Sequence, residues 1–260
     1  MTEKAKVLIE QVNEKIEQLA GLVDDAARSE AMQAFFQTMA RFHRYSLNNI
    51  FLILDQKPDA TFVAGYRDWQ NKFDRQVQLG EKGIRILAPC KYKSDPDDPE
   101  SAWEIRGFRV VTVFDVSQTD GKALPTCPIW DSEEVNKKLD AALRDFAGSR
   151  GITIQDNPVR GKGSSAGGTI KIAPDTGTLT LIHEIAHELL HQDKEEMITR
   201  QDAEIEAEAV AFVVGSAFGL QSEASPNYLA LWAVDPEAIA ARANRIRSAS
   251  IEIIGGITNV

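Results

Sequence analysis

Cysteine, histidine and long apolar runs are all scarce in this chain of 260 residues. The two cysteines, Cys90 and Cys127, lie far apart and form no C-x-x-C pair, which excludes a disulfide framework and a structural zinc site closed by thiolates. No apolar run approaches the length of a membrane-spanning helix, and residues 1–20 have a charged amphipathic pattern without the apolar core of a signal peptide. We therefore expect a cytoplasmic protein in a reducing compartment, with no membrane partner.

The acidic net charge of −10 is distributed unevenly along the chain, in which 43% of the residues are hydrophobic. This length and composition suffice for a real core and predict two modest domains. Residues 28–93 contain 11 basic and 6 acidic residues and carry a net charge of +5, whereas residues 1–27 carry −3 and residues 94–260 carry −12. The N-terminal half is therefore compatible with nucleic-acid binding, and the C-terminal half is not.

Two of the four histidines form the motif His-Glu-x-x-His, at His183, Glu184 and His187. Residues four apart lie on one face of a helix, so both imidazoles can bind the same cation. Glu184 is the neighbouring carboxylate that would take a proton from a water molecule activated by that cation. The apolar flanks predict a buried helix, with Thr176 or Thr178 as its N-cap. This arrangement is typical of a hydrolytic zinc site, although Mn²⁺ or Co²⁺ would suit similar ligands.

Two histidines leave the site incomplete, and the expected helix over residues 200–214 offers the missing carboxylate. Glu204 and Glu208 lie four apart on a face that also carries apolar residues, so at least one carboxylate must face inward and needs a cation or hydrogen bonds. We assign Glu208 as the third ligand and Glu204 to a supporting position beside an imidazole or a water. The reverse assignment and Glu206 both stay open. We interpret His191, one further turn along the motif helix, as a hydrogen-bonded core residue.

The pattern of apolar residues, glycines and prolines predicts an α+β protein of two domains. Residues 1–120 would form the first domain, with helices and a small mixed sheet, and residues 131–260 the second, with the motif helix. Residues 121–130, which include Pro125 and Pro128, are the predicted linker. Helices are expected near residues 1–20, 29–43, 46–54, 132–147, 226–232 and 236–253, and strands near 61–63, 84–88, 103–108, 110–116, 152–154 and 169–172.

The glycine-rich segment over residues 161–168 does not have the residue order of a phosphate-binding loop, and no helix follows its glycines. Glycine lets another chain approach the backbone closely. We therefore expect residues 161–173 to provide an edge strand above the metal helix that pairs with the backbone of a substrate.

The C-terminal motifs resemble a known group of peptidases. His-Glu-Ile-Ala-His-Glu followed by Glu-Ile-Glu-Ala-Glu-Ala-Val-Ala-Phe is similar to the zincin-type peptidase domains of the ImmA/IrrE and ArdC groups, over about residues 165–220. The resemblance implies a zincin-like metallopeptidase domain in which the second helix supplies the last metal ligand.

The N-terminal half resembles the N-terminal domain of ArdC-type antirestriction proteins over about residues 28–116. The motifs that carry this resemblance are Tyr45–Ile50, Ala64–Trp69, Gln76–Ile84 and Ile86–Pro89. It implies binding of single-stranded DNA, with aromatic rings stacking on bases, cations contacting phosphates and an amide adding hydrogen bonds. Tyr66 and Trp69 could instead be core residues. The candidates are Asn49, Tyr66, Arg67, Trp69, Arg75, Lys82, Arg85 and Lys91.

Together these features predict a zinc-dependent metallopeptidase-like protein with a domain that binds single-stranded DNA. Its role would be antirestriction, or proteolysis of a protein partner linked to DNA. Two alternatives stay open: a non-enzymatic DNA-protecting protein with a structural metal site, and a regulatory protease that cleaves a repressor.

Overall fold

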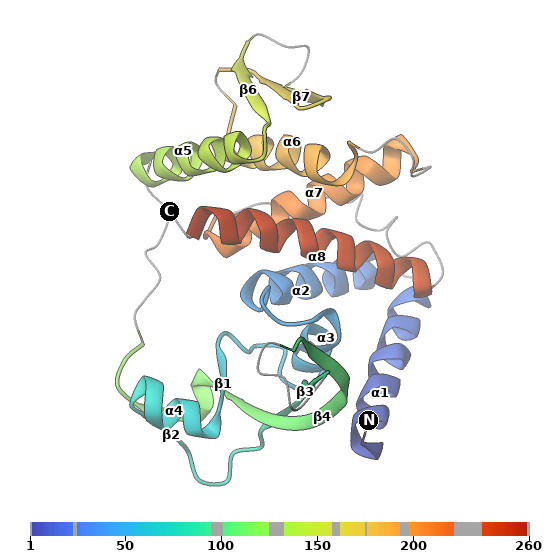
Figure 1. Ribbon diagram of the computed structural model, residues 1–260, viewed down its shortest axis with the longest axis vertical. Coiled ribbons are helices and arrows are strands. Elements are labelled where there is room, and N and C mark those ends of the chain that lie inside the picture. The colour runs from blue at the N-terminus through green and yellow to red at the C-terminus, as the bar shows by residue number, and fades with distance from the viewer. Residues whose placement is uncertain are drawn as a thin grey trace. The chain divides into compact units, whose positions relative to one another are not determined.

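The computed structural model describes residues 2–22, 25–94, 101–124, 133–157, 162–174, 176–192, 198–220 and 236–258 (Figure 1). Helices and small sheets are mixed, which confirms the expected α+β class. Among the described residues, no helix combines the length and hydrophobicity that a membrane span requires. Contacts between residues divide the chain into two compact units, the first comprising Met1–Gln18 and Tyr45–Thr126 and the second Leu19–Arg44 and Cys127–Val260.

The first unit combines helices with a three-stranded antiparallel sheet of order β1-β4-β3 and a two-stranded sheet of β2 and β5. The first helix is amphipathic as predicted, with Leu8, Val12, Ile16 and Leu19 buried and Val7 48% exposed. Ser46 caps α3 through its side chain, at the point where the sequence pattern predicted the start of a helix. The elements are α1 (Glu3–Ala20), α3 (Leu47–Gln56), β1 (Val63–Gly65), α4 (Tyr66–Phe73), β2 (Arg75–Val77), β3 (Ile84–Lys93), β4 (Trp103–Asp115), a 3₁₀ turn (Val116–Gln118) and β5 (Thr119–Gly121).

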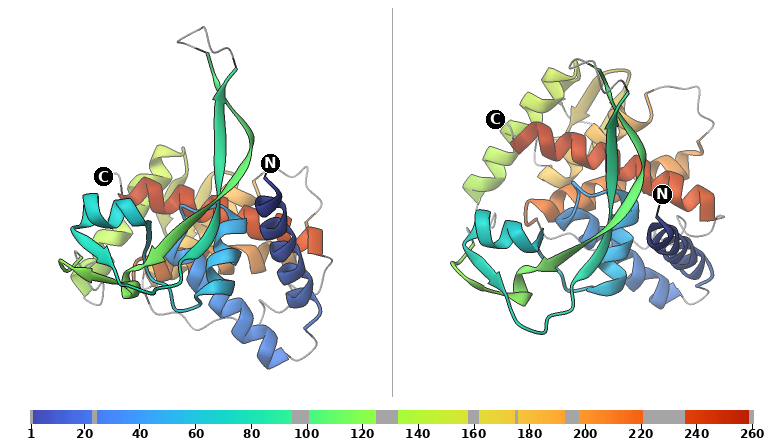
Figure 2. Two further views of the ribbon diagram at one scale, coloured as in Figure 1. Left: turned by 90° about the horizontal axis from the view of Figure 1, so that it is seen from below. Right: turned by 60° about the horizontal axis from the view of Figure 1, so that its bottom comes forward.

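Strand β4 corrects the prediction of two strands over residues 103–116. It is one continuous strand that pairs with β3, and the register shifts between Pro89 and Lys91. Gly107, with φ of 153°, adopts a backbone conformation that other residues rarely take, so the strand bends there without ending. The far end of this β3–β4 pair extends well beyond the helices of its own unit (Figure 2).

In its described residues, the second unit contains five helices and a small sheet of order β6-β8-β7, in which β6 is parallel and β7 antiparallel to β8. The sheet packs against α5 and α6. Gly167 and Gly168 make the turn between β7 and β8 with positive φ angles of 59° and 83°. Strand β7 lies at the edge of this sheet. The elements are α2 (Asp25–Arg41), α5 (Glu133–Ser149), β6 (Thr153–Asp156), β7 (Gly163–Ala166), β8 (Thr169–Ile172), α6 (Thr178–Leu190), α7 (Arg200–Ala217) and α8 (Pro236–Thr258).

Helix α2 packs with the C-terminal helices. Its buried apolar stripe includes Phe36, whose ring centroid lies 6.3 Å from that of Phe212 in α7. The structural unit therefore differs from the predicted domain of residues 1–120, because residues 19–44 belong to the second unit. Helix α6 begins after Gly177, and neither Thr176 nor Thr178 is its N-cap. Three predicted features lie outside the described residues: the first residue of the helix expected over 132–147, residues 125–130 of the linker, and the helix expected over 226–232.

Candidate metal centre

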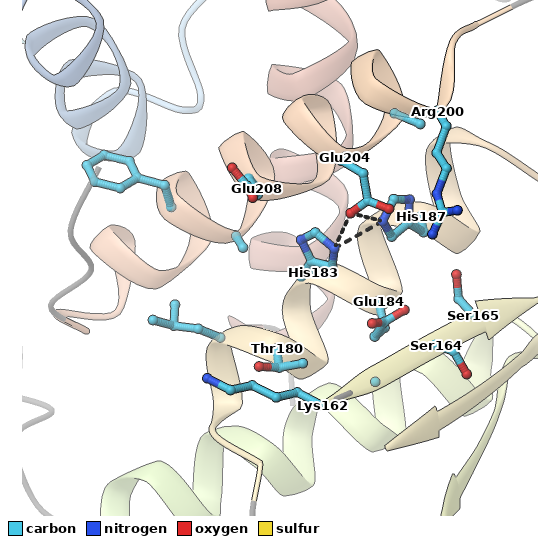
Figure 3. Close-up of a pocket in the computed structure, with 15 residues that line it drawn as sticks. Lys162, Ser164, Ser165, Thr180, His183, Glu184, His187, Arg200, Glu204 and Glu208 are labelled. Carbon is cyan, nitrogen blue, oxygen red and sulfur yellow. Dashed lines mark hydrogen bonds and ion pairs between the residues drawn. The ribbon is translucent and has the colours of Figure 1, made fainter. Parts of the chain in front are cut away.

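Helix α6 brings the two histidines of the motif together on one face. The Nε2 atoms of His183 and His187 lie 3.0 Å apart, and their ring centroids are separated by 4.6 Å. Glu204 projects from α7 toward the same point (Figure 3), with its Oε2 atom 3.4 Å from Nε2 of His183 and 3.6 Å from Nε2 of His187. Three ligand atoms from two helices therefore converge within 4.8 Å of one another.

The carboxylate that joins the imidazoles is Glu204, not Glu208, which the sequence analysis assigned as the third ligand. Among the described residues, the group able to hold a metal ion is His183, His187 and Glu204. Glu208 lies one turn further along α7 and lines the same pocket (Figure 3). Helices α6 and α7 contact each other along their lengths, with Leu179 beside Gly215 at one end and His187 beside Glu204 at the other. This pairing favours the reverse of the predicted assignment.

The spacing of the three ligand atoms fits a divalent cation. Zinc bonds to imidazole nitrogen and carboxylate oxygen are about 2.0–2.2 Å long, so two ligand atoms on one tetrahedral ion lie about 3.3–3.6 Å apart. The separations here are 3.0, 3.4 and 3.6 Å. Two nitrogens and one carboxylate suit zinc, and also Mn²⁺ or Co²⁺. The two separations that involve Glu204 fall within the calculated range, and the separation of the two nitrogens is slightly shorter, so a small rotation of an imidazole would accommodate the expected cation.

Burial keeps both imidazoles in the form that a metal requires. It lowers the pKa of His183 below the ordinary value of 6.5, and the carboxylates of Glu204 and Glu208 oppose this effect. Burial, followed by the charge of His183, lowers the pKa of His187 to about 4. Both rings are neutral at neutral pH, and each retains an unprotonated nitrogen for a cation.

The metal-ligand group lies in a cavity of about 850 Å³ within the second unit. Strand β7 forms part of its wall through Gly163, Ser164 and Ser165. Lys162 and Arg200 also line the cavity (Figure 3). The cavity therefore combines an edge strand, two cationic side chains and a cluster of metal-ligand atoms.

Glu184 is buried beside this cluster, with 6% of its surface exposed. Burial, followed by the charges of Glu204 and Glu188, raises its pKa to about 7. Its side chain packs against Gly163, because a Cβ atom at that position would lie 2.6 Å from Oε1 of Glu184. Glu188 in turn accepts a hydrogen bond of 2.9 Å from the backbone N–H of Gly168, which ties the β7–β8 turn to α6. A glycine in β7 thus makes room for the carboxylate.

A chain of hydrogen-bonding groups lies behind His187. Its Nδ1 atom is 3.2 Å from Nδ1 of His191, and Nε2 of His191 is 3.2 Å from Oε2 of Glu206. Arg245 of α8 donates to the same oxygen, also at 3.2 Å. The sequence analysis interpreted His191 as a core residue and gave no sign of Arg245, because nothing local in the sequence relates α8 to the motif helix.

Three of the residues predicted to contact DNA hold the first unit together. Asn49 is buried and exchanges two hydrogen bonds with the backbone of Leu87, at 2.9 and 2.8 Å. Trp69 has no exposed surface, and its indole N–H donates to the backbone carbonyl of Phe114. Arg75 donates to Thr119 and to the carbonyls of the turn that follows it. Tyr66, Arg67, Lys82 and Arg85 are exposed.

The far end of the β3–β4 pair carries exposed apolar side chains that the sequence analysis did not single out. We call Lys91–Lys93 with Trp103–Phe108 the β3–β4 arm. Tyr92 is 53% exposed, Trp103 63%, Ile105 56% and Phe108 36%. Lys91 and Lys93 lie opposite Ile105 and Trp103 in the ladder, so the four side chains share one face. Alternating apolar and polar residues in the sequence would have indicated this face.

A comparison with known families identifies the N-terminal part of the chain. Residues 3–114 match the model of the N-terminal domain of anti-restriction factor ArdC. This part of the chain is similar to the ArdC N-terminal domain. The ArdC-type domain covers α1 to β4 and therefore includes the exposed β3–β4 arm.

Other similarities extend beyond the ArdC-type domain. An uncharacterized protein of Bacillus anthracis is 24% identical over 254 residues, which cover 78% of this chain and 43% of that protein. The chain thus spans less than half the length of this relative. The crystal structures of the antirestriction ArdC protein from plasmid R388 are similar at 18% identity and a TM-score of 0.48 for the metal-free form, and 17% and 0.49 for the Mn(II)-bound form. Each match covers 82% of this chain and 84% of that chain.

Proposed function

We propose that the second unit is a zincin-like, metal-dependent peptidase domain in which His183, His187 and Glu204 hold a divalent cation. The observation that carries this proposal is the convergence of three ligand atoms beside the buried carboxylate of Glu184. Two half-buried imidazoles and a carboxylate that face one point lose hydration there, and a bound cation would offset that cost. Zinc is the cation that this set of donors favours.

The roles of the protein groups follow from their positions. A divalent cation bound here supplies a Lewis acid that polarises a carbonyl oxygen and makes water more acidic. Glu184 accepts the proton of the attacking water on a carboxylate oxygen and then delivers it to the nitrogen of the departing amine. In the metal-free protein the pKa of Glu184 is about 7, and a cation bound nearby would lower it, so the side chain would be ionised and able to accept the proton.

Strand β7 is the proposed binding site for the substrate backbone. It lies at the edge of its sheet and lines the cavity, so an extended peptide can add to it as a further strand. Lys162 and Arg200 place positive charge along the same cavity. We therefore expect an extended peptide with acidic side chains to bind better than a basic one.

Peptide cleavage tests this proposal. A library of fluorogenic peptides is incubated with the parent protein, with the parent plus a chelator, and with Glu184→Gln. We expect cleavage by the parent, loss of cleavage with the chelator, and zinc binding without turnover in Glu184→Gln. Cleavage by Glu184→Gln at the parental rate would show that the carboxylate is not the base.

The second candidate function is binding of single-stranded DNA by the ArdC-type domain, with a role in DNA protection. The β3–β4 arm favours it, because Lys91 and Lys93 share a face with the exposed ring of Trp103. Aromatic faces stack on unpaired bases, and neighbouring cations contact the phosphates. Exposed Tyr66, Arg67, Lys82 and Arg85 supply further contacts on this unit.

Gel shifts with single- and double-stranded DNA over a range of salt concentrations test the second candidate. We expect a preference for the single strand and weaker binding at higher salt. Adding the DNA to the peptide assay then separates the roles. Cleavage that needs DNA supports proteolysis linked to DNA, whereas DNA protection that survives chelation supports a non-enzymatic protein whose metal is structural.

A further inference from the structure

His187 is held from both sides of its ring. Its Nε2 atom faces His183 and Glu204, while Nδ1 points the other way and lies 3.2 Å from Nδ1 of His191. His191 ends α6, and its backbone N–H donates to the carbonyl of His187. The two rings therefore occupy successive turns of one helix, with a fixed spacing.

The contacts determine where the protons lie if Nε2 of His187 binds a cation. Nε2 then carries no proton, so the proton of this neutral ring is on Nδ1, which donates to His191. His191 must accept at its own Nδ1 atom, which leaves its proton on Nε2. That N–H points at Oε2 of Glu206, 3.2 Å away. Each contact thus has one donor and one acceptor.

Glu206 and Arg245 anchor the far end of this chain. Glu206 is 1% exposed, and its Oε2 atom also accepts from Nε of Arg245 at 3.2 Å. Arg245 donates in addition to the carbonyl of Leu190, at 3.1 Å, in the last turn of α6. The guanidinium stabilises the negative charge of the buried Glu206, and it joins α8 to the end of the motif helix.

We propose that His191, Glu206 and Arg245 are positioning residues that fix the tautomer and the ring orientation of His187 for metal binding. This inference rests on the proposed metal site. A hydrogen-bond acceptor behind a ligating imidazole increases its basicity and holds the ring in place, and losing such a partner typically costs about 10- to 100-fold in metal affinity. His191 in this role differs from a histidine that only fills the core, because its Nδ1 atom accepts the proton of His187 while its Nε2 atom donates to Glu206.

The test measures the affinity of the full chain for Zn²⁺ by competition with a chromogenic chelator. His191→Phe keeps the ring volume and removes both hydrogen bonds, and we expect zinc affinity to fall by about 10- to 100-fold. His191→Asn offers an acceptor near the position of Nδ1, so it should retain more affinity than phenylalanine. Glu206→Gln keeps an acceptor but removes the charge, and it should also bind zinc more weakly than the parent.

His43→Phe is the matched control. His43 lies after α2, far along the sequence from the motif, and its Nδ1 atom is 3.0 Å from the carbonyl oxygen of Ala40. It should bind zinc as the parent does. Thermal melting of the metal-free variants checks folding, and His191→Asn and Glu206→Gln carry the test if His191→Phe does not fold.

Two results would overturn the inference in different ways. Parental zinc affinity in folded His191→Phe, or equal affinity in the asparagine and phenylalanine variants, would refute the positioning role and leave the metal site intact. A parent protein without zinc affinity would refute the proposed function together with this inference.

Discussion

At the scale of single residues, Glu184 is a carboxylate that burial keeps partly protonated near neutral pH. Its pKa of about 7 lies above the ordinary value of 4.5. The folded, metal-free protein therefore binds more protons at this group than the unfolded chain does between these two values. By linkage, the stability that this group contributes is present below pH 4.5 and is lost as the pH rises through 7.

The first prediction follows from this linkage. Glutamine resembles the protonated carboxyl and does not ionise, so metal-free Glu184→Gln should gain stability relative to the metal-free parent as the pH rises from about 4.5 to about 8. The gain is at most about 3 kcal/mol, from a pKa difference of about 2.5. Urea unfolding of both proteins at several pH values measures it. Because His187 titrates in both proteins, its opposite contribution cancels, and a difference that is constant with pH would contradict the prediction.

The sequence predicted some site residues and missed others for a physical reason. The meeting of His183 and His187 depends only on the geometry of one helix, which the spacing of residues determines. The choice between Glu204 and Glu208 depends on how α7 crosses α6, and the approach of Arg245 depends on α8. Packing between helices leaves no local pattern in the sequence, so these assignments required coordinates.

At the scale of elements, β7 and α6 meet through a glycine. A Cβ atom at Gly163 would lie 2.6 Å from Oε1 and 2.9 Å from Cγ of Glu184. Gly163→Ala should therefore move the strand or the carboxylate and reduce peptide cleavage by about 100-fold, with zinc affinity retained. Gly148→Ala is the control, because a Cβ atom there meets nothing within 4 Å. Parental activity in Gly163→Ala would show that β7 does not determine the position of the base.

The β3–β4 arm makes a second prediction at this scale. Trp103 is 63% exposed, whereas Trp69 has no exposed surface. Trp103→Ala should weaken binding of single-stranded DNA by about 1–3 kcal/mol and leave stability almost unchanged. Trp69→Ala should instead lower the free energy of unfolding by about 3–5 kcal/mol. Gel shifts measure DNA binding and urea unfolding measures stability. Unchanged DNA binding by Trp103→Ala would show that the β3–β4 arm does not bind DNA through this ring.

The elements themselves were partly predictable. The amphipathic pattern of α1 and the start of α3 near Ser46 are local signals, and both correspond to the structure. The number of strands over residues 103–116 was wrong, because the predicted break at Arg109 is absent and Arg109 pairs with Ala88 of β3. The partner of α2 was also missed, because an apolar stripe shows that a helix is buried and does not show against what.

At the scale of the whole molecule, the two proposed functions use separate side chains. The metal ligands belong to the second unit and the β3–β4 arm to the first. Glu204→Ala should therefore retain parental binding of single-stranded DNA, and Trp103→Ala should retain parental zinc affinity. Each variant is measured in both assays. Loss of both functions from either substitution would contradict their separation.

The metal content of the whole chain tests the central claim most directly. Purified parent, Glu204→Ala and Glu208→Ala are saturated with zinc, dialysed and analysed for bound metal per chain. The arrangement of His183, His187 and Glu204 predicts one zinc ion per chain in the parent and in Glu208→Ala, and loss of that ion in Glu204→Ala. A parent without bound zinc, or an ion that survives in Glu204→Ala and is lost in Glu208→Ala, would contradict the account.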